Sequence, residues 1–207
     1  MDKFDLAMRD MPLVAVLRGI TPEEIIPVAD GLMAAGFRLV EVPLNSPRAF
    51  DSIAALVAHC PPEVLTGAGT VLDVAQVRRL AESGARLMVT PNTDPAVIRA
   101  GAAAGLVPVI GCLTPSEALG AVANGARALK VFPASRMGPD YLKDIRAVLP
   151  AGTRLIPVGG IDAKSMPAFH AKGADGFGFG TNLYKPGMSA DEVAANALHL
   201  VQTWRDL

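Results

Sequence analysis

The sequence predicts an α/β protein, a (βα)8 barrel of the TIM type preceded by a short N-terminal helix. Short apolar runs recur at intervals of roughly 20 to 25 residues, and each is followed by a turn and a segment with helical i, i+3, i+4 apolar spacing. A parallel sheet buried on both faces is apolar throughout, and hydrophobic residues make up 51% of the 207 residues. Eight such units could also form an open doubly wound sheet, but their number favours closure.

The expected strands are short, apolar and bounded by turn residues. They are residues 13–18, 39–44, 64–69, 86–91, 107–112, 126–132, 154–158 and 174–180. The segment before Leu13 is expected to be the extra helix, covering the bottom of the barrel. No linker, low-complexity segment or change of composition divides the chain, so residues 1–207 are expected to form one barrel domain.

The helices between these strands carry recognisable start and stop signals. Residues 21–24 (Thr-Pro-Glu-Glu) place a capping side chain, a proline at the first helical position and acids in the first turn, and Gly36 is expected to end this helix. The same opening role is expected of Asp73, Asp94, Thr114 and Asp162.

Composition and charge favour a small-molecule partner. The formal net charge is −1, and acids and bases are interspersed, so neither nucleic acid nor an anionic membrane surface is attracted. Residues 100–126 carry one charge, Glu117, but their prolines and glycines indicate a helix end, a strand and a helix start rather than a membrane span. The first ten residues lack the apolar core of a secretory signal, so a cytoplasmic location is expected. Cys60 and Cys112 are expected to be reduced thiols.

Lys130 is the first candidate for chemistry. Alternation in its strand places Ala128, Lys130 and Phe132 on one face, and the other lysines fall in helices, loops or the leading segment. Catalytic groups of barrels lie at the C-terminal ends of strands, and a partly desolvated lysine loses basicity, which gives the neutral amine that attacks a carbonyl. The alternative is a structural lysine whose ammonium reaches solvent from the end of the barrel.

Glu41 interrupts an apolar strand in the same way, on the face that it shares with Leu39. Burial of a carboxylate without a partner is costly, so a structural role requires an ion pair, for which Arg18 is the candidate. Beside Lys130, the same carboxylate offers the general acid–base catalysis that carbinolamine formation, dehydration and carbon–carbon cleavage require. Both interpretations stay open on this residue alone.

Glycines at the ends of the last two strands predict a phosphate site. Residues 158–161 (Val-Gly-Gly-Ile) and 176–181 (Gly-Phe-Gly-Phe-Gly-Thr) offer unobstructed backbone N–H groups where barrels commonly bind phosphate, although these glycines could instead serve tight turns. Thr70 and Pro91 are expected to provide a hydroxyl and a rigid wall at the barrel mouth. His59, His170 and His199 are expected on the surface of helices without ligand-like spacing, so neither a metal site nor a cofactor is expected.

Several motifs in this order resemble the 2-keto-3-deoxy-6-phosphogluconate/6-phosphogalactonate aldolase family, from about Pro12 to the C-terminus. They are residues 16–20 (Val-Leu-Arg-Gly-Ile), 40–47 (Val-Glu-Val-Pro-Leu-Asn-Ser-Pro), 67–72 (Gly-Ala-Gly-Thr-Val-Leu), 90–92 (Thr-Pro-Asn), 130–135 (Lys-Val-Phe-Pro-Ala-Ser) and 158–160 (Val-Gly-Gly). The resemblance implies a metal-independent class I aldolase, folded as a (βα)8 barrel and typically a homotrimer. Its substrates would be a phosphorylated 2-keto-3-deoxy sugar acid and pyruvate.

The resemblance also implies roles for individual residues. Lys130 would form the Schiff base and Glu41 would be the acid–base residue. The substrate-binding residues would be Arg18, Thr70 and Phe132 around the pyruvate half, Gly160, Gly180 and Thr181 at the phosphate, and Pro91, Val158 and Gly159 beside them. Asn45 and Val158 stand where the gluconate branch usually has arginine and threonine, so the chain looks most like the 6-phosphogalactonate branch. Because position 45 is not an arginine, a positive charge expected near the phosphate is missing there.

Three other functions remain open. The main substrate could be the gluconate epimer or 4-hydroxy-2-oxoglutarate, which assays with the separate compounds would distinguish. The barrel could instead be a phosphosugar isomerase or decarboxylase in which Lys130 acts only as a charge, and no covalent adduct would then form. A phosphate-binding sensor without catalysis is disfavoured because Glu41 and Lys130 are both present.

Overall fold

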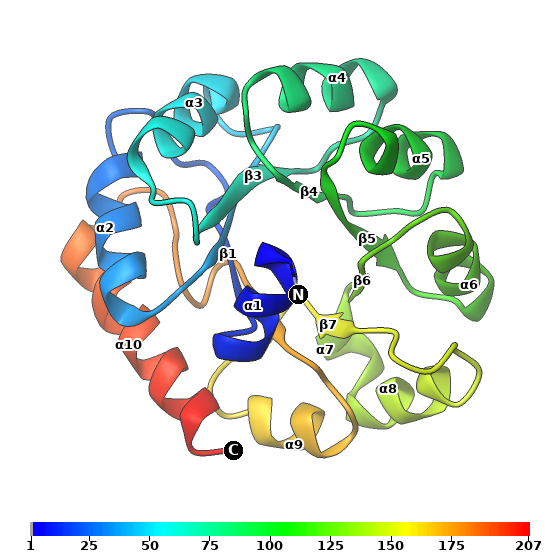
Figure 1. The fold of residues 1–207 in the computed structure, drawn as a ribbon. Coiled ribbons are helices and arrows are strands. Elements are labelled where there is room, and N and C mark those ends of the chain that lie inside the picture. The colour runs from blue at the N-terminus through cyan, green and yellow to red at the C-terminus, as the bar shows by residue number, and fades with distance from the viewer. Residues whose placement is uncertain (1) are drawn as a thin grey trace.

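The computed structural model describes residues 2–207, and its centre is an eight-stranded parallel sheet closed into a barrel (Figure 1). The strands are hydrogen-bonded in the order β7-β6-β5-β4-β3-β2-β1-β8, and an isolated parallel bridge between Val158 and Gly178 joins the two ends. Their bounds are β1 (Leu13–Val16), β2 (Leu39–Pro43), β3 (Leu65–Gly69), β4 (Leu87–Val89), β5 (Val107–Cys112), β6 (Ala128–Val131), β7 (Leu155–Pro157) and β8 (Phe177–Phe179). Each lies within a predicted segment, so the predicted barrel is confirmed.

Helices surround the strands as an outer ring, with α1 lying across the centre of the ring in Figure 1. Over residues 2–207 they are α1 (Lys3–Asp10), α2 (Ile25–Ala35), α3 (Ala49–His59), α4 (Val74–Glu82), α5 (Pro95–Ala103), α6 (Pro115–Ala123), α7 (Ala134–Met137), α8 (Pro139–Arg146), α9 (Met166–Ala171) and α10 (Ala190–Arg205). None of them is both long and apolar enough to cross a membrane.

Most of the predicted helix signals are confirmed. Asp73, Asp94 and Thr114 accept hydrogen bonds from backbone N–H groups of the first turns of α4, α5 and α6. Gly36 ends α2 with a φ of 116°, a left-handed conformation that an L side chain would strain.

Two predicted helix starts are wrong. The backbone N–H and hydroxyl of Thr21 both donate to the Glu24 carboxylate, which closes a turn, and α2 begins only at Ile25. The Asp162 carboxylate likewise accepts from the Ser165 N–H at 2.9 Å, so α9 begins at Met166. In both cases the residue expected to cap the helix takes part in a single turn that precedes the helix.

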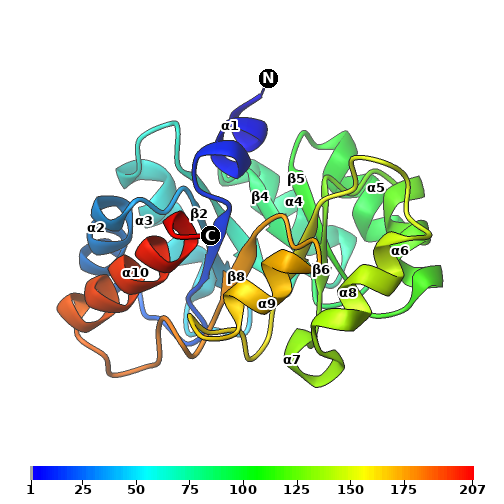
Figure 2. The same ribbon diagram turned by 90° about the horizontal axis from the view of Figure 1, so that it is seen from below.

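The apolar side chains form two cores, inside and outside the barrel wall. Leu129 and Val131 pack outward against the helices, whereas Ala128 faces inward. The inner core is closed from below by Phe4, Ala7 and Met8 of α1, as the predicted bottom-covering helix requires. In Figure 2, α1 lies at one end of the barrel and α7 at the other. The inner strand residues of this core are Val14, Leu39, Leu65, Leu87, Val89, Val109, Ala128, Ile156 and Val158.

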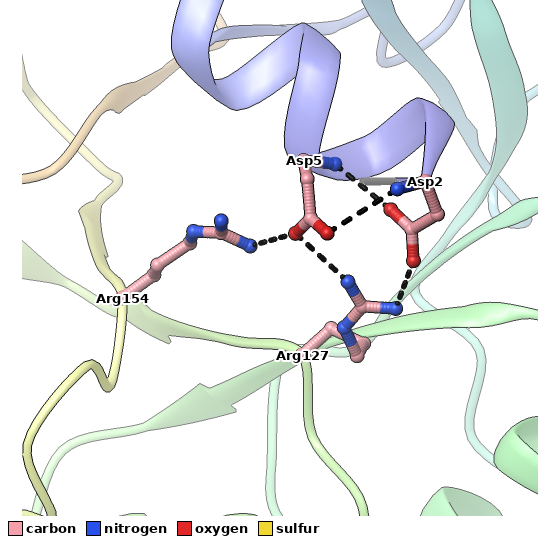
Figure 3. Close-up of polar contacts among 4 residues, drawn as sticks. All are labelled: Asp2, Asp5, Arg127 and Arg154. Carbon is pink, nitrogen blue, oxygen red and sulfur yellow. Dashed lines mark hydrogen bonds and ion pairs between the residues drawn. The ribbon is translucent and has the colours of Figure 1, made fainter.

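A network of charges fixes α1 to the bottom of the barrel (Figure 3). Arg127, before β6, reaches Asp2 at 2.7 Å and Asp5 at 3.0 Å, and Arg154, before β7, reaches Asp5 at 2.8 Å. The Arg127 side chain is the main cause that lowers the pKa of Asp2 to about 2, and Arg154 is the main cause that lowers the pKa of Asp5. Both carboxylates are therefore ionised at neutral pH.

Candidate active site

The barrel interior holds two buried charged side chains above its apolar layer. Glu41, in the middle of β2, is 1% exposed, and Lys130, near the C-terminal end of β6, is 5% exposed. Leu39 and Ala128, two residues before each of them, belong to the inner core, so the alternation of both strands directs Glu41 and Lys130 inward. The predicted shared face is confirmed for both strands.

Glycines of the strands next to β2 and β6 allow close contacts around these two side chains. A Cβ atom on Gly69 would lie 2.0 Å from Glu41 Oε2, and a Cβ atom on Gly111, the register partner of Lys130, would lie 2.3 Å from the carbonyl carbon of Pro91. The sequence predicts no role for either glycine. Their even spacing from inward-facing Leu65 and Val109 was the signal that could have identified them.

Burial dominates the electrostatics of this pair. Desolvation raises the pKa of Glu41 to about 7, against the opposing charges of Lys130 and Arg18, and Glu41 Oε2 has no hydrogen-bond partner within the described chain. Desolvation also lowers the pKa of Lys130, an effect that the Arg18 charge reinforces and the Glu41 charge opposes. A less basic amine beside a carboxyl that titrates near neutrality can attack a carbonyl and exchange protons with the adduct.

Arg18 does not form the ion pair that a structural role for Glu41 would require. The Arg18 guanidinium is exposed just beyond β1, and its Nη1 donates to Asn45 Oδ1 at 2.5 Å. Its charge still acts on both Glu41 and Lys130. The alternative interpretation of Glu41 as the partner of Arg18 is therefore wrong for this structure, because a neutral amide on the next loop holds the guanidinium.

Three other predicted residues lie at the same end of the barrel. The Lys130 Nζ lies 5.2 Å from the centre of the Phe132 ring, which is 39% exposed. Thr70 directly follows β3 with a φ of 56°, a left-handed conformation that is unusual for threonine. Pro91 packs over Gly111 because the Thr90 hydroxyl ties this turn down, donating to the Asn92 carbonyl and accepting from the Gly111 N–H.

The predicted phosphate residues follow β7 and β8. Val158 is buried against the inner core, and its bridge to Gly178 brings the two strand ends together. Gly159 and Gly160 both have left-handed φ values, of 95° and 74°. Gly180 and Thr181 follow β8, and a Cβ atom on Gly180 would meet nothing within 4 Å, so there is open space beside this glycine.

Ser135, the last residue of the 130–135 motif, is a neighbour of this region for which the sequence predicts no role. Its backbone N–H donates to the Gly159 carbonyl, and a Cβ atom on Gly160 would lie 2.3 Å from its hydroxyl oxygen. The contact joins the start of α7 to the end of β7, a pairing that no spacing in the sequence indicates.

The three histidines lie on helices α3, α9 and α10. His59 and His199 are exposed, as expected, and His59 contacts Asp30. His170 is not a surface residue: it is half-buried, its ring packs edge-on to Trp204 at 5.3 Å, and its Nδ1 lacks a hydrogen-bond partner in the described structure. Across residues 2–207, no group of three or more His, Cys, Asp or Glu side chains is arranged to hold a metal ion.

A large cavity lies at the other end of the barrel. It measures about 670 Å³ and runs from α1 along the starts of β3, β4 and β5, with Phe4, Leu65 and Val107 among its lining residues. The carboxyl ends of the ring helices point toward this side and disfavour anions. The buried Lys130 and Glu41 are absent from its lining, so this cavity is separate from the candidate active site.

Comparison with known proteins shows which family this chain resembles. The family model for KDPG and KHG aldolase matches residues 4–197. A probable 2-dehydro-3-deoxy-6-phosphogalactonate aldolase of Rhizobium meliloti is 49% identical over 198 residues, which cover 96% of this chain and 93% of the relative. The 2-dehydro-3-deoxy-6-phosphogalactonate aldolase of Escherichia coli is 42% identical over 196 residues, with coverage of 95% and 96%. A solved structure described as "Native KDPGal structure" superposes with a TM-score of 0.93 at 42% identity and covers 95% of both chains. The chain therefore belongs to the KDPG and KHG aldolase family.

Proposed function

We propose that this protein is a class I aldolase that cleaves 2-dehydro-3-deoxy-6-phosphogalactonate to pyruvate and D-glyceraldehyde 3-phosphate. The observation that carries the proposal is the buried pair inside the barrel, in which the pKa of Lys130 is lowered and that of Glu41 is raised to about 7. These shifts supply a carbonyl nucleophile and a proton carrier close together inside the barrel. The names of the 49% and 42% identical relatives support the choice of the galactonate substrate.

The reaction starts when the neutral Lys130 amine attacks the C2 ketone and forms a carbinolamine. Loss of water then gives an iminium ion, for which Glu41 delivers a proton to the departing hydroxyl. A carboxyl with a pKa of about 7 can both donate and accept protons near neutral pH, which suits it to both tasks.

Cleavage follows when Glu41, now ionised, removes the proton of the C4 hydroxyl, directly or through one water. The C4–O electrons form the aldehyde, the C3–C4 bond breaks, and its electrons pass into the iminium to give an enamine. The aldehyde leaves as glyceraldehyde 3-phosphate. Protonation of the enamine at C3 and hydrolysis then release pyruvate and return the free Lys130 amine.

The remaining predicted residues would bind the two ends of the substrate. Arg18, Thr70 and Phe132 would surround the pyruvate half, next to Lys130. The phosphate would bind the backbone N–H groups of Gly160 and Gly180 and the Thr181 hydroxyl. Pro91, Val158 and Gly159 would line the space between these ends. The two consecutive left-handed glycines at the end of β7 support this, because they expose backbone where a phosphate could approach.

The Schiff base is tested by incubating the protein with pyruvate and borohydride and measuring the intact mass and the labelled peptide. One reduced pyruvyl group is expected, on Lys130. Lys130→Arg should take up none, whereas Lys164→Arg, in the loop after β7, should be labelled like the wild type. Labelling at another lysine, or no labelling of the wild type, would overturn the mechanism. Turnover should also persist in EDTA, because the iminium accepts the electrons of the broken bond.

Substrate choice is tested with the separate compounds. The galactonate epimer should be cleaved at least as well as the gluconate epimer by kcat/KM. 4-Hydroxy-2-oxoglutarate should be the poorer substrate, since it has no phosphate for the glycines after β7 and β8 to bind. A strong preference for either alternative would reassign the main activity within the same family.

We also propose that the chain assembles as a homotrimer, as its family resemblance implies. Large apolar side chains that stay exposed, among them Leu72 at 48% and Leu119 at 42%, would be candidates for burial between the subunits. Light scattering should give three times the chain mass of 21.5 kDa.

A further inference from the structure

We infer that Asn45 is a positioning residue, which holds the Arg18 guanidinium at the mouth of the barrel without neutralising its charge. The inference rests on the proposed function, in which Arg18 lies beside the pyruvate half of the substrate, and it takes the carboxylate of that half as the group that the guanidinium would bind. It gives a role to position 45, where the family resemblance indicated only that a positive charge is missing.

Two consecutive hydrogen bonds join the loops after β1 and β2. Arg18 Nη1 donates to Asn45 Oδ1 at 2.5 Å, and the Gly19 N–H donates to Ser46 Oγ at 2.9 Å. Ser46 is 8% exposed, and Gly19 has a φ of 85°, so this turn has a defined geometry. The connection is local to the mouth, because Arg18 and Asn45 each lie two residues beyond the end of their strand.

Without Asn45, nothing in residues 2–207 would hold the guanidinium. The bond to Asn45 is the one hydrogen bond of the exposed Arg18 side chain in this part of the chain, and no described carboxylate pairs with it. An arginine side chain samples many rotamers, and binding of a carboxylate would freeze it. Asn45 restricts this freedom before the substrate arrives.

The amide of Asn45 matters because it carries no charge. Arg48, nearby on the chain, shows the alternative: its guanidinium pairs with the Glu23 carboxylate. A carboxylate at position 45 would compete with the substrate for Arg18 and would cancel its charge. At present that charge lowers the pKa of both Glu41 and Lys130, so it reaches the reacting groups. An asparagine oxygen accepts the hydrogen bond and leaves this field intact.

The test measures the initial rate of borohydride-trapped adduct formation against pyruvate concentration and pH. Asn45→Ala should raise the half-saturating pyruvate concentration by roughly three- to tenfold, the effect of one lost hydrogen bond. Asn45→Asp, nearly identical in shape, should raise it further. It should also move the pH of half-maximal trapping upward, because a neutralised Arg18 no longer lowers the pKa of Lys130. A change of packing alone would not move this pH.

Two controls separate positioning from general damage. Asn124→Ala removes a comparable exposed contact, with Arg99 between α5 and α6, and should change neither measurement. In an Arg18→Met background, Asn45→Ala should have no further effect, since Asn45 acts through Arg18.

The inference is overturned if folded Asn45→Ala and Asn45→Asp trap pyruvate like the wild type, or if the effect of Asn45→Ala persists without Arg18. These outcomes differ from failure of the proposed function. If the wild-type protein forms no adduct at Lys130, the aldolase mechanism itself fails.

Discussion

The two ends of the barrel shift the pKa of a carboxyl group in opposite directions. At the bottom, Asp5 accepts hydrogen bonds from Arg127 and Arg154 while it keeps contact with solvent, and its pKa is lowered (Figure 3). Toward the mouth, Glu41 lies near the charges of Lys130 and Arg18 but is desolvated, and its pKa is raised to about 7.

The comparison shows that nearby positive charge alone does not decide the protonation state. Direct hydrogen bonds stabilise the ionised Asp5, whereas Glu41 loses its hydration and gains no equal replacement. The first arrangement stabilises the docked α1, and the second keeps a proton available for chemistry. This division agrees with barrels in general, whose carboxyl strand ends carry catalysis while the opposite face contributes stability.

The largest expected effect comes from removal of the ionisable group near the mouth. Glu41→Gln should lower turnover on the order of 10²- to 10⁴-fold, the usual loss for a general acid–base catalyst, while circular dichroism stays native. Glu63→Gln, an exposed change between α3 and β3, should keep full turnover. Near-wild-type activity of Glu41→Gln would show that Glu41 is not the acid–base catalyst and that its role is structural.

The same variant should change how stability depends on pH. The pKa of Glu41 is about 7 in the folded protein against 4.5 for an unperturbed carboxyl, so the folded state binds more protons between these values and loses stability as pH rises through them. The glutamine of Glu41→Gln cannot ionise, so the variant does not lose this stability. The free energy of unfolding in urea, variant minus wild type, should therefore rise by about 3 kcal/mol from pH 4 to pH 8. A difference that stays constant over this range would show that Glu41 is not desolvated as described.

A smaller effect is expected for Val158, which is buried beside Gly159 and Gly160 after β7 and faces the inner core. Val158→Thr keeps the shape but adds a hydroxyl, and one hydrogen bond is worth about 0.5–1.5 kcal/mol, or roughly three- to tenfold in rate. The ratio of kcat/KM for the two epimers should therefore shift toward gluconate by this factor. An unchanged ratio would mean that Val158 does not contact the substrate's middle carbons.

The smallest effect is expected at the bottom of the barrel. Asp5→Asn weakens the contacts with Arg127 and Arg154, which are partly exposed, so it should lower the free energy of unfolding by about 1 kcal/mol and leave kcat unchanged. Because folding lowers the pKa of Asp5, this contribution is present above the unfolded value of 3.8 and should disappear as the pH falls below it. A drop in kcat would contradict the separation of the two ends.

The sequence by itself determined the strands, the helix-covered bottom and the inward faces of β2 and β6. Each follows from a local rule. Alternation along a strand places Glu41 on the same face as Leu39 and Lys130 on the same face as Ala128. Short apolar runs with turns between them specify the units of a barrel. Caps such as Asp73 and Thr114 are equally local, since their partners lie in the next turn.

Only the tertiary structure decided the features that depend on neighbours from other strands. Glycine spacing allows room for Glu41, but the contact with Gly69 and the pKa near 7 depend on which strands pack around it. The sequence allows an ion pair between Arg18 and Glu41, but in the folded protein the Arg18 guanidinium donates to Asn45. Desolvation is a property of the assembled surroundings, and no pattern within one segment of chain can specify it.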